Sequence, residues 1–104
     1  MNRKKLEIKF EWDHGNKTKN WIKHKISVEE TEESFYDSDA VVSDDENHSE
    51  KIEVRYILIG KTKKGKILYT AFTLREDRIR PISSRLTNKK EVKIYEKKIN
   101  SSKV

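Results

Sequence analysis

Apolar and charged residues alternate along residues 6–12, which read Leu-Glu-Ile-Lys-Phe-Glu-Trp. A period of two is typical of a strand with one buried face. Asp13 follows in a position to cap a helix, because its carboxylate can accept the unpaired amide hydrogens of a first turn. We therefore expect a strand over residues 6–12 and a helix from there to about residue 24. Lys17, Asn20 and His24 would share one face of that helix.

A second helix is predicted by a capping box, Ser27-Val28-Glu29-Glu30, in which serine and the glutamate three residues later satisfy each other's backbone donors. It should end near Tyr36, with Val28 and Phe35 pointing inward. Residues 37–50 are acidic and polar and have no hydrophobic period, so we expect a solvated loop there.

Three strands are predicted next, over residues 53–59, 67–74 and 78–86. Residues 60–65 begin and end with glycine, as a hairpin turn does, and residues 67–74 are the most apolar, as a central strand would be. A further capping box, Asn88 with Glu91, opens a last helix to about residue 98 that buries Val92, Tyr95 and Ile99.

The predicted order is β-α-α-β-β-β-α, an α+β fold with a small antiparallel meander sheet and packed helices. The length of 104 residues suits one domain. We expect that domain over residues 1–99, with residues 37–50 as an acidic loop within it and residues 100–104 as a frayed C-terminal tail.

The composition narrows the class of protein to which this chain can belong. Only 33% of the residues are hydrophobic and 40% are charged, so the core must be small. There is no cysteine, which removes disulfides and thiolate metal sites. The basic N-terminus is followed by no apolar run of a secretory signal, and no segment approaches the roughly 18 apolar residues of a membrane span. We expect a soluble, cytoplasmic protein.

The net charge of +6 is unevenly distributed. Residues 1–28 carry a balance of +5, residues 29–53 of −10 and residues 54–104 of +11, and four of the six arginines lie between residues 75 and 85. Lysines of this kind usually only keep a small protein in solution. The clustered arginines indicate a site for a charged partner such as a nucleic acid.

An ordered set of short motifs covers residues 10–96 and resembles the BrnT family of toxins. The motifs are Phe10-Glu11-Trp12-Asp13; Lys17, Asn20 and Lys23-His24; Ser27 with Glu29-Glu30; Phe35 with Asp37; Arg55-Tyr56-Ile57-Leu58-Ile59-Gly60; Gly65-Lys66-Ile67-Leu68; Arg80-Pro81-Ile82-Ser83-Ser84-Arg85; and Glu91 with Tyr95-Glu96. The sequence departs from the family pattern at Lys25, where glycine is usual, at Pro81, where an apolar residue is usual, and at Thr31, where alanine is common.

The resemblance implies a RelE-like fold and an endoribonuclease toxin that halts translation by cleaving RNA. It also implies neutralisation by a BrnA-like antitoxin, a protein with a ribbon-helix-helix part, in a heterotetramer that binds promoter DNA only through the antitoxin. We therefore expect a type II toxin–antitoxin system, with RNA and the antitoxin as partners and no membrane contact.

Metal-free RNA cleavage needs a proton acceptor at the 2′-hydroxyl, cations at the phosphate oxygens and a proton donor at the leaving oxygen. Arginine suits the second role because its planar fork meets two phosphate oxygens at once. Arg55, Arg80 and Arg85 lie on strands that a meander places side by side, and we predict that they form the phosphate-binding cluster. Alternatively, Arg80 or Arg85 pairs with Glu91, Glu96 or the antitoxin.

Strand parity constrains this cluster. Positions 80 and 85 differ by an odd number, so in a regular strand their side chains point to opposite faces. Pro81 lacks an amide hydrogen and favours edges and bulges. If both arginines serve one site, a bulge or break must lie between them.

His24 is the predicted proton-transfer group because its ordinary pKa is near neutrality; the alternative is a histidine that only stabilises a helix C-terminus. Lys23, Lys17 and Tyr95 are candidate RNA-binding residues, although the helical spacing of Tyr95 also fits the core. We find no metal-ligand spacing and no phosphate-binding glycine loop, and we expect neither a metal nor a cofactor.

Two other functions fit the composition: a non-catalytic basic module that binds nucleic acid, and a pure protein-interaction module. The first would bind RNA with strong salt dependence but leave it intact. The second would neither bind nor cleave it.

Overall fold

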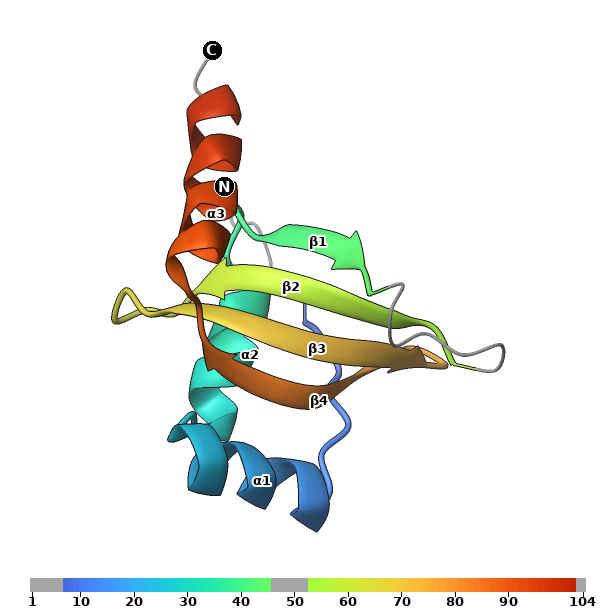
Figure 1. Ribbon diagram of the computed structural model, residues 1–104. Coiled ribbons are helices and arrows are strands. Elements are labelled where there is room, and N and C mark those ends of the chain that lie inside the picture. Colours follow the sequence, from blue (N-terminus) through green and yellow to red (C-terminus); the bar gives the residue numbers. More distant parts are fainter. Residues whose placement is uncertain (1–6, 46–52, 103–104) are drawn as a thin grey trace, which may run out of the picture.

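The computed structural model describes residues 7–45 and 53–102 and is an α+β fold (Figure 1). A four-stranded antiparallel sheet has the order β1-β2-β3-β4, so each strand pairs with its neighbour in sequence. The elements in chain order are α1 (His14–His24), α2 (Val28–Phe35), β1 (Val41–Asp44), β2 (Arg55–Lys61), β3 (Ile67–Arg75), β4 (Arg78–Leu86) and α3 (Lys89–Ser102).

The expected N-terminal strand over residues 6–12 is not formed in the described part of this segment; residue 6 lies outside it. The segment makes one parallel bridge, Phe10 to Ile79, against the outer edge of β4. Its apolar residues pack on α2 instead: the Phe10 ring meets the Phe35 ring edge-on at 5.4 Å, and the Trp12 indole N–H donates to Glu32 at 2.8 Å. The alternation of apolar and charged residues in this segment therefore reflects packing on α2.

The acidic loop expected over residues 37–50 contains a short strand. Val41–Asp44 forms β1 and pairs with β2, with Val41 opposite Ile59 and Asp44 opposite Tyr56. Val41 packs against the core while the next three residues are exposed. One half-buried side chain leaves no visible hydrophobic period, which is why the sequence pattern missed this strand. Residues 46–52 of the expected loop lie outside the described residues.

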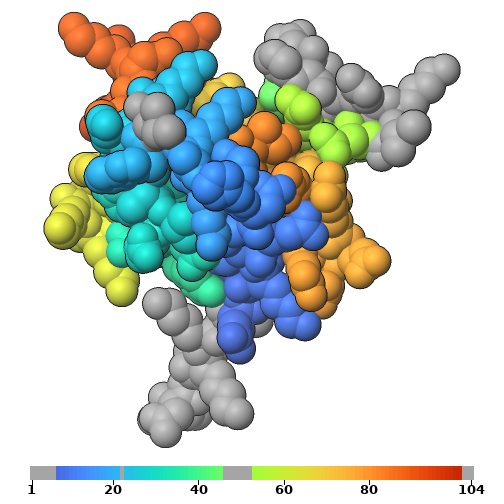
Figure 2. Space-filling view, turned by 90° about the horizontal axis from the view of Figure 1, so that it is seen from below, coloured from blue at the N-terminus to red at the C-terminus, as the bar shows by residue number. Residues whose placement is uncertain are grey.

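The two faces of the sheet have different covers. On one face Phe72 meets Phe35 of α2 edge-on at 5.1 Å and stacks on Tyr56 at 5.5 Å. Figure 2, seen from below, shows α1 in blue against α2 in cyan on this side of the molecule. On the other face Ile57, Ile59 and Ala71 form a small core with Tyr95 of α3.

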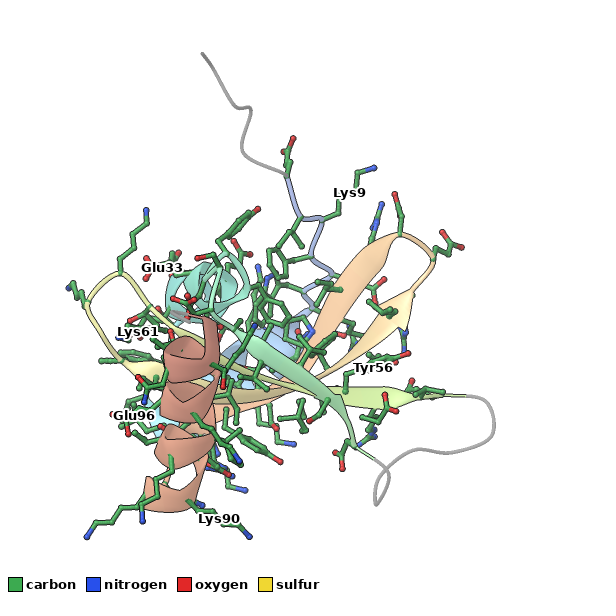
Figure 3. All side chains as sticks on the ribbon, turned by 90° about the horizontal axis from the view of Figure 1, so that it is seen from above. Lys9, Glu33, Tyr56, Lys61, Lys90 and Glu96 are labelled. Carbon is green, nitrogen blue, oxygen red and sulfur yellow. The ribbon has the colours of Figure 1, made fainter. Side chains whose placement is uncertain are left out.

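Helix α3 covers only one end of the sheet face on which it packs. Seen from above, it stands over the Lys61 end of β2, whereas Tyr56 lies toward the end that α3 leaves open (Figure 3). The Tyr95 hydroxyl donates to the Asp37 carboxylate at 2.5 Å, and Lys98 Nζ donates to the carbonyl oxygen of Ala40. The helix continues to Ser102, so the start of the expected tail at residue 100 was too early.

Three predicted caps are confirmed. The Asp13 carboxylate accepts from the Asn16 amide at 2.9 Å, and Ser27 with Glu30 forms the expected capping box. Asn88 and Glu91 bond reciprocally at the start of α3, at 2.9 Å each way. Lys25 ends α1 in the left-handed conformation, with φ of 57°, so this position keeps the geometry that glycine adopts more easily.

Among residues 7–45 and 53–102, no helix combines the length and the apolar composition that crossing a bilayer requires.

Candidate functional site

Strand β4 contains a bulge at Ile82, which confirms the break required by the spacing of the arginines. Pro81 pairs with Phe72 of β3 and Ser83 pairs with Ala71, so Ile82 has no cross-strand partner. Arg80 therefore lies opposite Thr73, and Arg85 lies opposite Tyr69. Thr73 and Tyr69 are four residues apart on β3 and share a face, so the two arginines share it as well.

The same register brings in the third arginine. Arg55 of β2 also pairs with Thr73, from the side opposite Arg80. Arg55, Thr73 and Arg80 thus form one row across three strands, and the outer two backbones are about 10 Å apart, two strand spacings. The three predicted arginines rise from one face of the sheet, Arg55 and Arg80 on the part that α3 leaves open and Arg85 beside the start of α3. We call this surface the arginine face.

A cleft of about 450 Å³ lies at one end of this face. It is lined by the row just described, by the start of α1 and by residues beside the bulge: Asp13, Gly15, Asn16, Lys19, Glu53, Arg55, Thr73, Arg75, Arg80, Pro81 and Ile82. A helix N-terminus with basic side chains beside it favours an anion. The cleft therefore suits a phosphate group.

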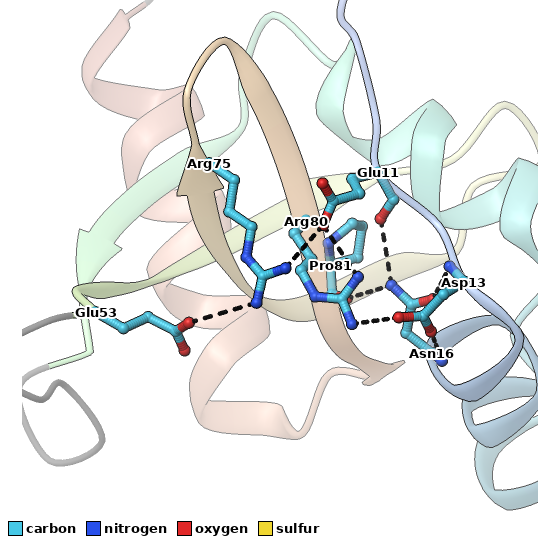
Figure 4. A network of polar contacts seen from close by, with 7 residues as sticks. All are labelled: Glu11, Asp13, Asn16, Glu53, Arg75, Arg80 and Pro81. Carbon is cyan, nitrogen blue, oxygen red and sulfur yellow. Dashed lines mark hydrogen bonds and ion pairs between the residues drawn. The ribbon is translucent and has the colours of Figure 1, made fainter.

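Carboxylates hold Arg75 and Arg80 of the cleft in place (Figure 4). Arg80 donates through Nη2 to Asp13 at 2.5 Å and through Nη1 to Glu11 at 3.2 Å. Arg75 donates to the same Glu11 oxygen at 3.1 Å and lies 4.0 Å from Glu53. A phosphate entering the cleft would compete with these carboxylates for guanidinium groups that are already oriented.

Asp13 links the cleft to α1. It caps the helix and binds Arg80, and the Asn16 amide and Arg80 together hold the pKa of Asp13 below its ordinary value. The hydrogen bond to Asp13 is also the main cause that raises the pKa of Arg80, and Glu11 adds to it. The pair is therefore fully charged at neutral pH.

Arg85 lies further along the arginine face, about 13 Å from the row because four residues of β3 separate the two positions. Its Nη1 and Nη2 donate to the two oxygens of Glu91 at 2.9 and 2.8 Å, and its guanidinium lies 4.1 Å from the centre of the Tyr69 ring. The alternative prediction of an ion pair with Glu91 is thus confirmed for Arg85. Within the described residues these contacts use Nη1 and Nη2, which leaves Nε–H for a phosphate oxygen.

His24 lies at the end of α1 that is nearer to Arg85. One helical turn before it, Asn20 accepts a hydrogen bond from the backbone amide of Ser84, the residue next to Arg85. Burial lowers the pKa of His24, and the positive charges of Lys23, Arg85 and Lys19 lower it further. The first turn of α1 and the cleft are about 15 Å away along the helix. The predicted site residues therefore form two groups, one at each end of α1.

We expect Arg85→Gln to raise the pKa of His24 toward the ordinary value of 6.5 without reaching it, because burial is the larger cause and is left in place. The pKa is measured by following the imidazole Cε1–H resonance against pH. Arg78→Gln, an exposed arginine on the same strand, is the matched control and should leave the titration unchanged. An identical His24 titration in both variants would show that Arg85 is not close to the imidazole.

The three predicted RNA-binding residues differ in their exposure to solvent. Lys23 and Lys17 are exposed on α1. Tyr95 is 2% exposed, and burial together with the Asp37 carboxylate raises its pKa. Its position in the core, between α3 and the sheet, fits the packing alternative and not contact with RNA.

Several residues of the cleft were not anticipated as a group. Glu11 and Glu53 are remote from Arg80 in sequence, and nothing in their local pattern indicated a shared network. Arg75 belonged to the arginines clustered between residues 75 and 85 but lay outside the strand predicted over residues 67–74, whereas it ends β3. Within residues 7–45 and 53–102, no three His, Cys, Asp or Glu side chains are grouped as a metal site would require.

The comparisons with known proteins identify one family. A family model described as the ribonuclease toxin BrnT of type II toxin–antitoxin systems matches residues 12–91. No curated protein matches the chain.

Proposed function

The chain belongs to the BrnT family of ribonuclease toxins of type II toxin–antitoxin systems, and we propose that it is a metal-independent endoribonuclease that cleaves RNA on the arginine face. In this proposal the protein acts in the cytoplasm, inhibits translation and has the RelE-like fold that the family implies. The observation that carries the proposal is the register of β4, because the bulge at Ile82 gives Arg80 and Arg85 a common face with Arg55.

The RNA strand would run along β4, from the cleft to the end of α1 that bears His24. Arg55 and Arg80 would bind one phosphate in the cleft, where the first turn of α1 adds amide hydrogens. This contact orients the strand. The titratable residues that line the cleft are carboxylates, arginines and one lysine, and no histidine is among them. Proton transfer is therefore assigned to the other end.

At that end His24 and Arg85 would act on the scissile phosphate. A histidine with a lowered pKa is neutral at pH 7 and can accept the proton of the 2′-hydroxyl. As the 2′-oxygen bonds to phosphorus, negative charge develops on the non-bridging oxygens, which Arg85 would stabilise through Nε–H. The bond from phosphorus to the 5′-oxygen then breaks, and the leaving oxygen would take its proton from water. This assigns His24 as the general base. Lys23 and Lys17, exposed on α1, would contribute further contacts to the RNA backbone.

Toxicity is the direct test in cells. Expression without an antitoxin should arrest growth of a bacterial host, and the double variant Arg80→Ala with Arg85→Ala should relieve the arrest while remaining folded. Arg78→Ala with Lys97→Ala removes the same charge from exposed positions and should remain toxic. Normal growth in the presence of folded wild-type protein would contradict the proposal. So would equal relief by both double variants.

The partner in this proposal is a BrnA-like antitoxin. Membership of a type II family implies a protein antitoxin; the ribbon-helix-helix protein, the heterotetramer and promoter binding through the antitoxin are the finer proposal. A short reading frame for such a protein immediately beside this gene would support it. Co-expression should then abolish toxicity and give a complex whose mass corresponds to two copies of each chain.

A further inference from the structure

Two asparagines of α1 hold β4 on either side of its bulge. Asn16 Nδ2 donates to the carbonyl oxygen of Pro81 at 3.0 Å, and Asn20 Oδ1 accepts from the backbone amide of Ser84 at 3.0 Å. The two asparagines are four residues apart and lie on the same side of the helix. Their side-chain amides therefore hold the backbone at Pro81, directly before Ile82, and at Ser84, two residues after it.

Both side chains are buried, Asn16 to 7% exposure and Asn20 to 1%. Asn20 Nδ2 has no hydrogen-bond partner among the described residues. A buried amide with one unsatisfied end costs stability, and a leucine of similar size would not carry that cost. What asparagine provides at this position is the acceptor for Ser84, on a strand where the regular ladder is broken.

We propose that Asn16 and Asn20 are positioning residues that fix the bulge in β4 and thereby place Arg80 and Arg85 on one face. Their importance for catalysis rests on the proposed nuclease function, whereas their control of the β3–β4 register does not. Pro81 cannot donate to the ladder, so β3 alone does not define the strand there. The asparagines supply the missing constraint from the helix side.

Loss of this constraint has a defined consequence. If β4 pairs regularly with β3 from Pro81 onward, each later residue moves by one position. Arg85 then lies opposite Leu68 in place of Tyr69, and its side chain turns to the face covered by α1 and α2. The arginine face would lose one of its three guanidinium groups although every arginine is still present.

The test compares Asn20→Leu with Ser84→Ala. Ser84→Ala removes the buried contact between the Ser84 and Thr70 hydroxyls, 3.0 Å apart, but keeps the backbone amide that Asn20 accepts from. Cross-strand nuclear Overhauser effects between Arg85 and Tyr69 report the register directly. We expect them to disappear in Asn20→Leu and to persist in Ser84→Ala. Their persistence in Asn20→Leu would overturn the proposal.

Cleavage of RNA is the second readout. Asn20→Leu should be slower by about 10²-fold, as for loss of one positioned donor at the reacting phosphate, and Ser84→Ala should stay within about threefold of wild type, a difference of about 0.7 kcal/mol. An equal loss in both variants would mean that Asn20 acts through stability alone, and would overturn the proposal.

Deletion of Ile82 in the Asn20→Leu background leaves Arg80 and Arg85 four positions apart. A regular strand then places both on one face, and cleavage should recover at least tenfold.

Failure of the two proposals can be distinguished. If wild-type protein leaves RNA intact, the nuclease proposal fails, and the register measurement still tests the asparagines. If Asn20→Leu does not fold, Asn20→Asp replaces it, because the carboxylate keeps an acceptor for Ser84. That variant should show the Arg85–Tyr69 contacts of wild type, and their loss would contradict the positioning role.

Discussion

Arg85→Gln is expected to lower the rate of RNA cleavage at saturating substrate by about 10²–10³-fold, the usual cost of removing one positioned donor to developing charge. The KM should change little, because the phosphate contacts in the cleft remain.

Arg80→Gln should show the reverse. It removes one phosphate contact, so KM rises, and the slope of log affinity against log salt concentration falls by about 0.7 for a single strand. Both are measured with a short fluorescent RNA over a range of salt concentrations.

Glu91→Gln is the control for Arg85, because it removes the charge of the partner and leaves the guanidinium in place. Burial opposes ionisation of Glu91, but Arg85 and the Asn88 amide hold its pKa below the ordinary value, so the pair is charged at pH 7. Glu91→Gln should therefore retain cleavage. A loss as large as that of Arg85→Gln would show that the ion pair, and not the arginine, is what cleavage requires.

Gly60→Ala is expected to destabilise the fold by about 3 kcal/mol, the upper part of the range for overpacking. An added Cβ would lie 2.3 Å from the carbonyl oxygen of Ser34, a backbone atom of α2, and 2.9 Å from Leu58 Cδ2. Because the obstacle is backbone, α2 must move away from β2. Thermal unfolding followed by circular dichroism should give a midpoint about 12–24 °C lower.

Gly15→Ala is the matched control for the glycine substitution. Its Cβ would meet only the Asp13 side chain, at 3.3 Å, and alanine favours a helix over glycine by about 1 kcal/mol. The midpoint of this variant should stay within about 8 °C of wild type. If Gly60→Ala were equally mild, the close approach of α2 to β2 would not be part of the native fold.

The elements with a repeated hydrophobic period could be predicted from the sequence. Strands β2, β3 and β4 and all three helices were expected within a few residues of their observed bounds, because alternation and capping are local signals. The predicted order of helices and strands was wrong at two places. Residues 7–12 alternate because they pack on α2, and β1 was hidden because a single side chain, Val41, faces the core.

The candidate site was predictable where it follows from strand register. Arg80 and Arg85 have an odd spacing, so a common face required a bulge between them. Pro81 indicated its place, and the bulge follows that residue. The partners of the arginines were not predictable. Asp13 was recognised as a cap, but the contact with Arg80 spans 67 residues and depends on the bridge that carries the N-terminal segment along β4.

His24 could be chosen from the sequence for its chemistry but not for its place. Its distance from the cleft follows from the direction of α1 along β4, which Asn16 and Asn20 determine through their contacts with Pro81 and Ser84. The division of the site residues between the two ends of α1 is therefore a property of helix packing, which no local pattern contains.

The most direct test of the nuclease mechanism is the chemistry of the RNA ends. Purified protein, kept in excess EDTA, is incubated with a short RNA and with the same RNA carrying one 2′-deoxy nucleotide at the cleaved position. If the 2′-hydroxyl attacks and His24 accepts its proton, the first RNA gives 2′,3′-cyclic phosphate ends and the second stays intact. Cleavage of the deoxy-substituted RNA, or cleavage that EDTA abolishes, would contradict this mechanism.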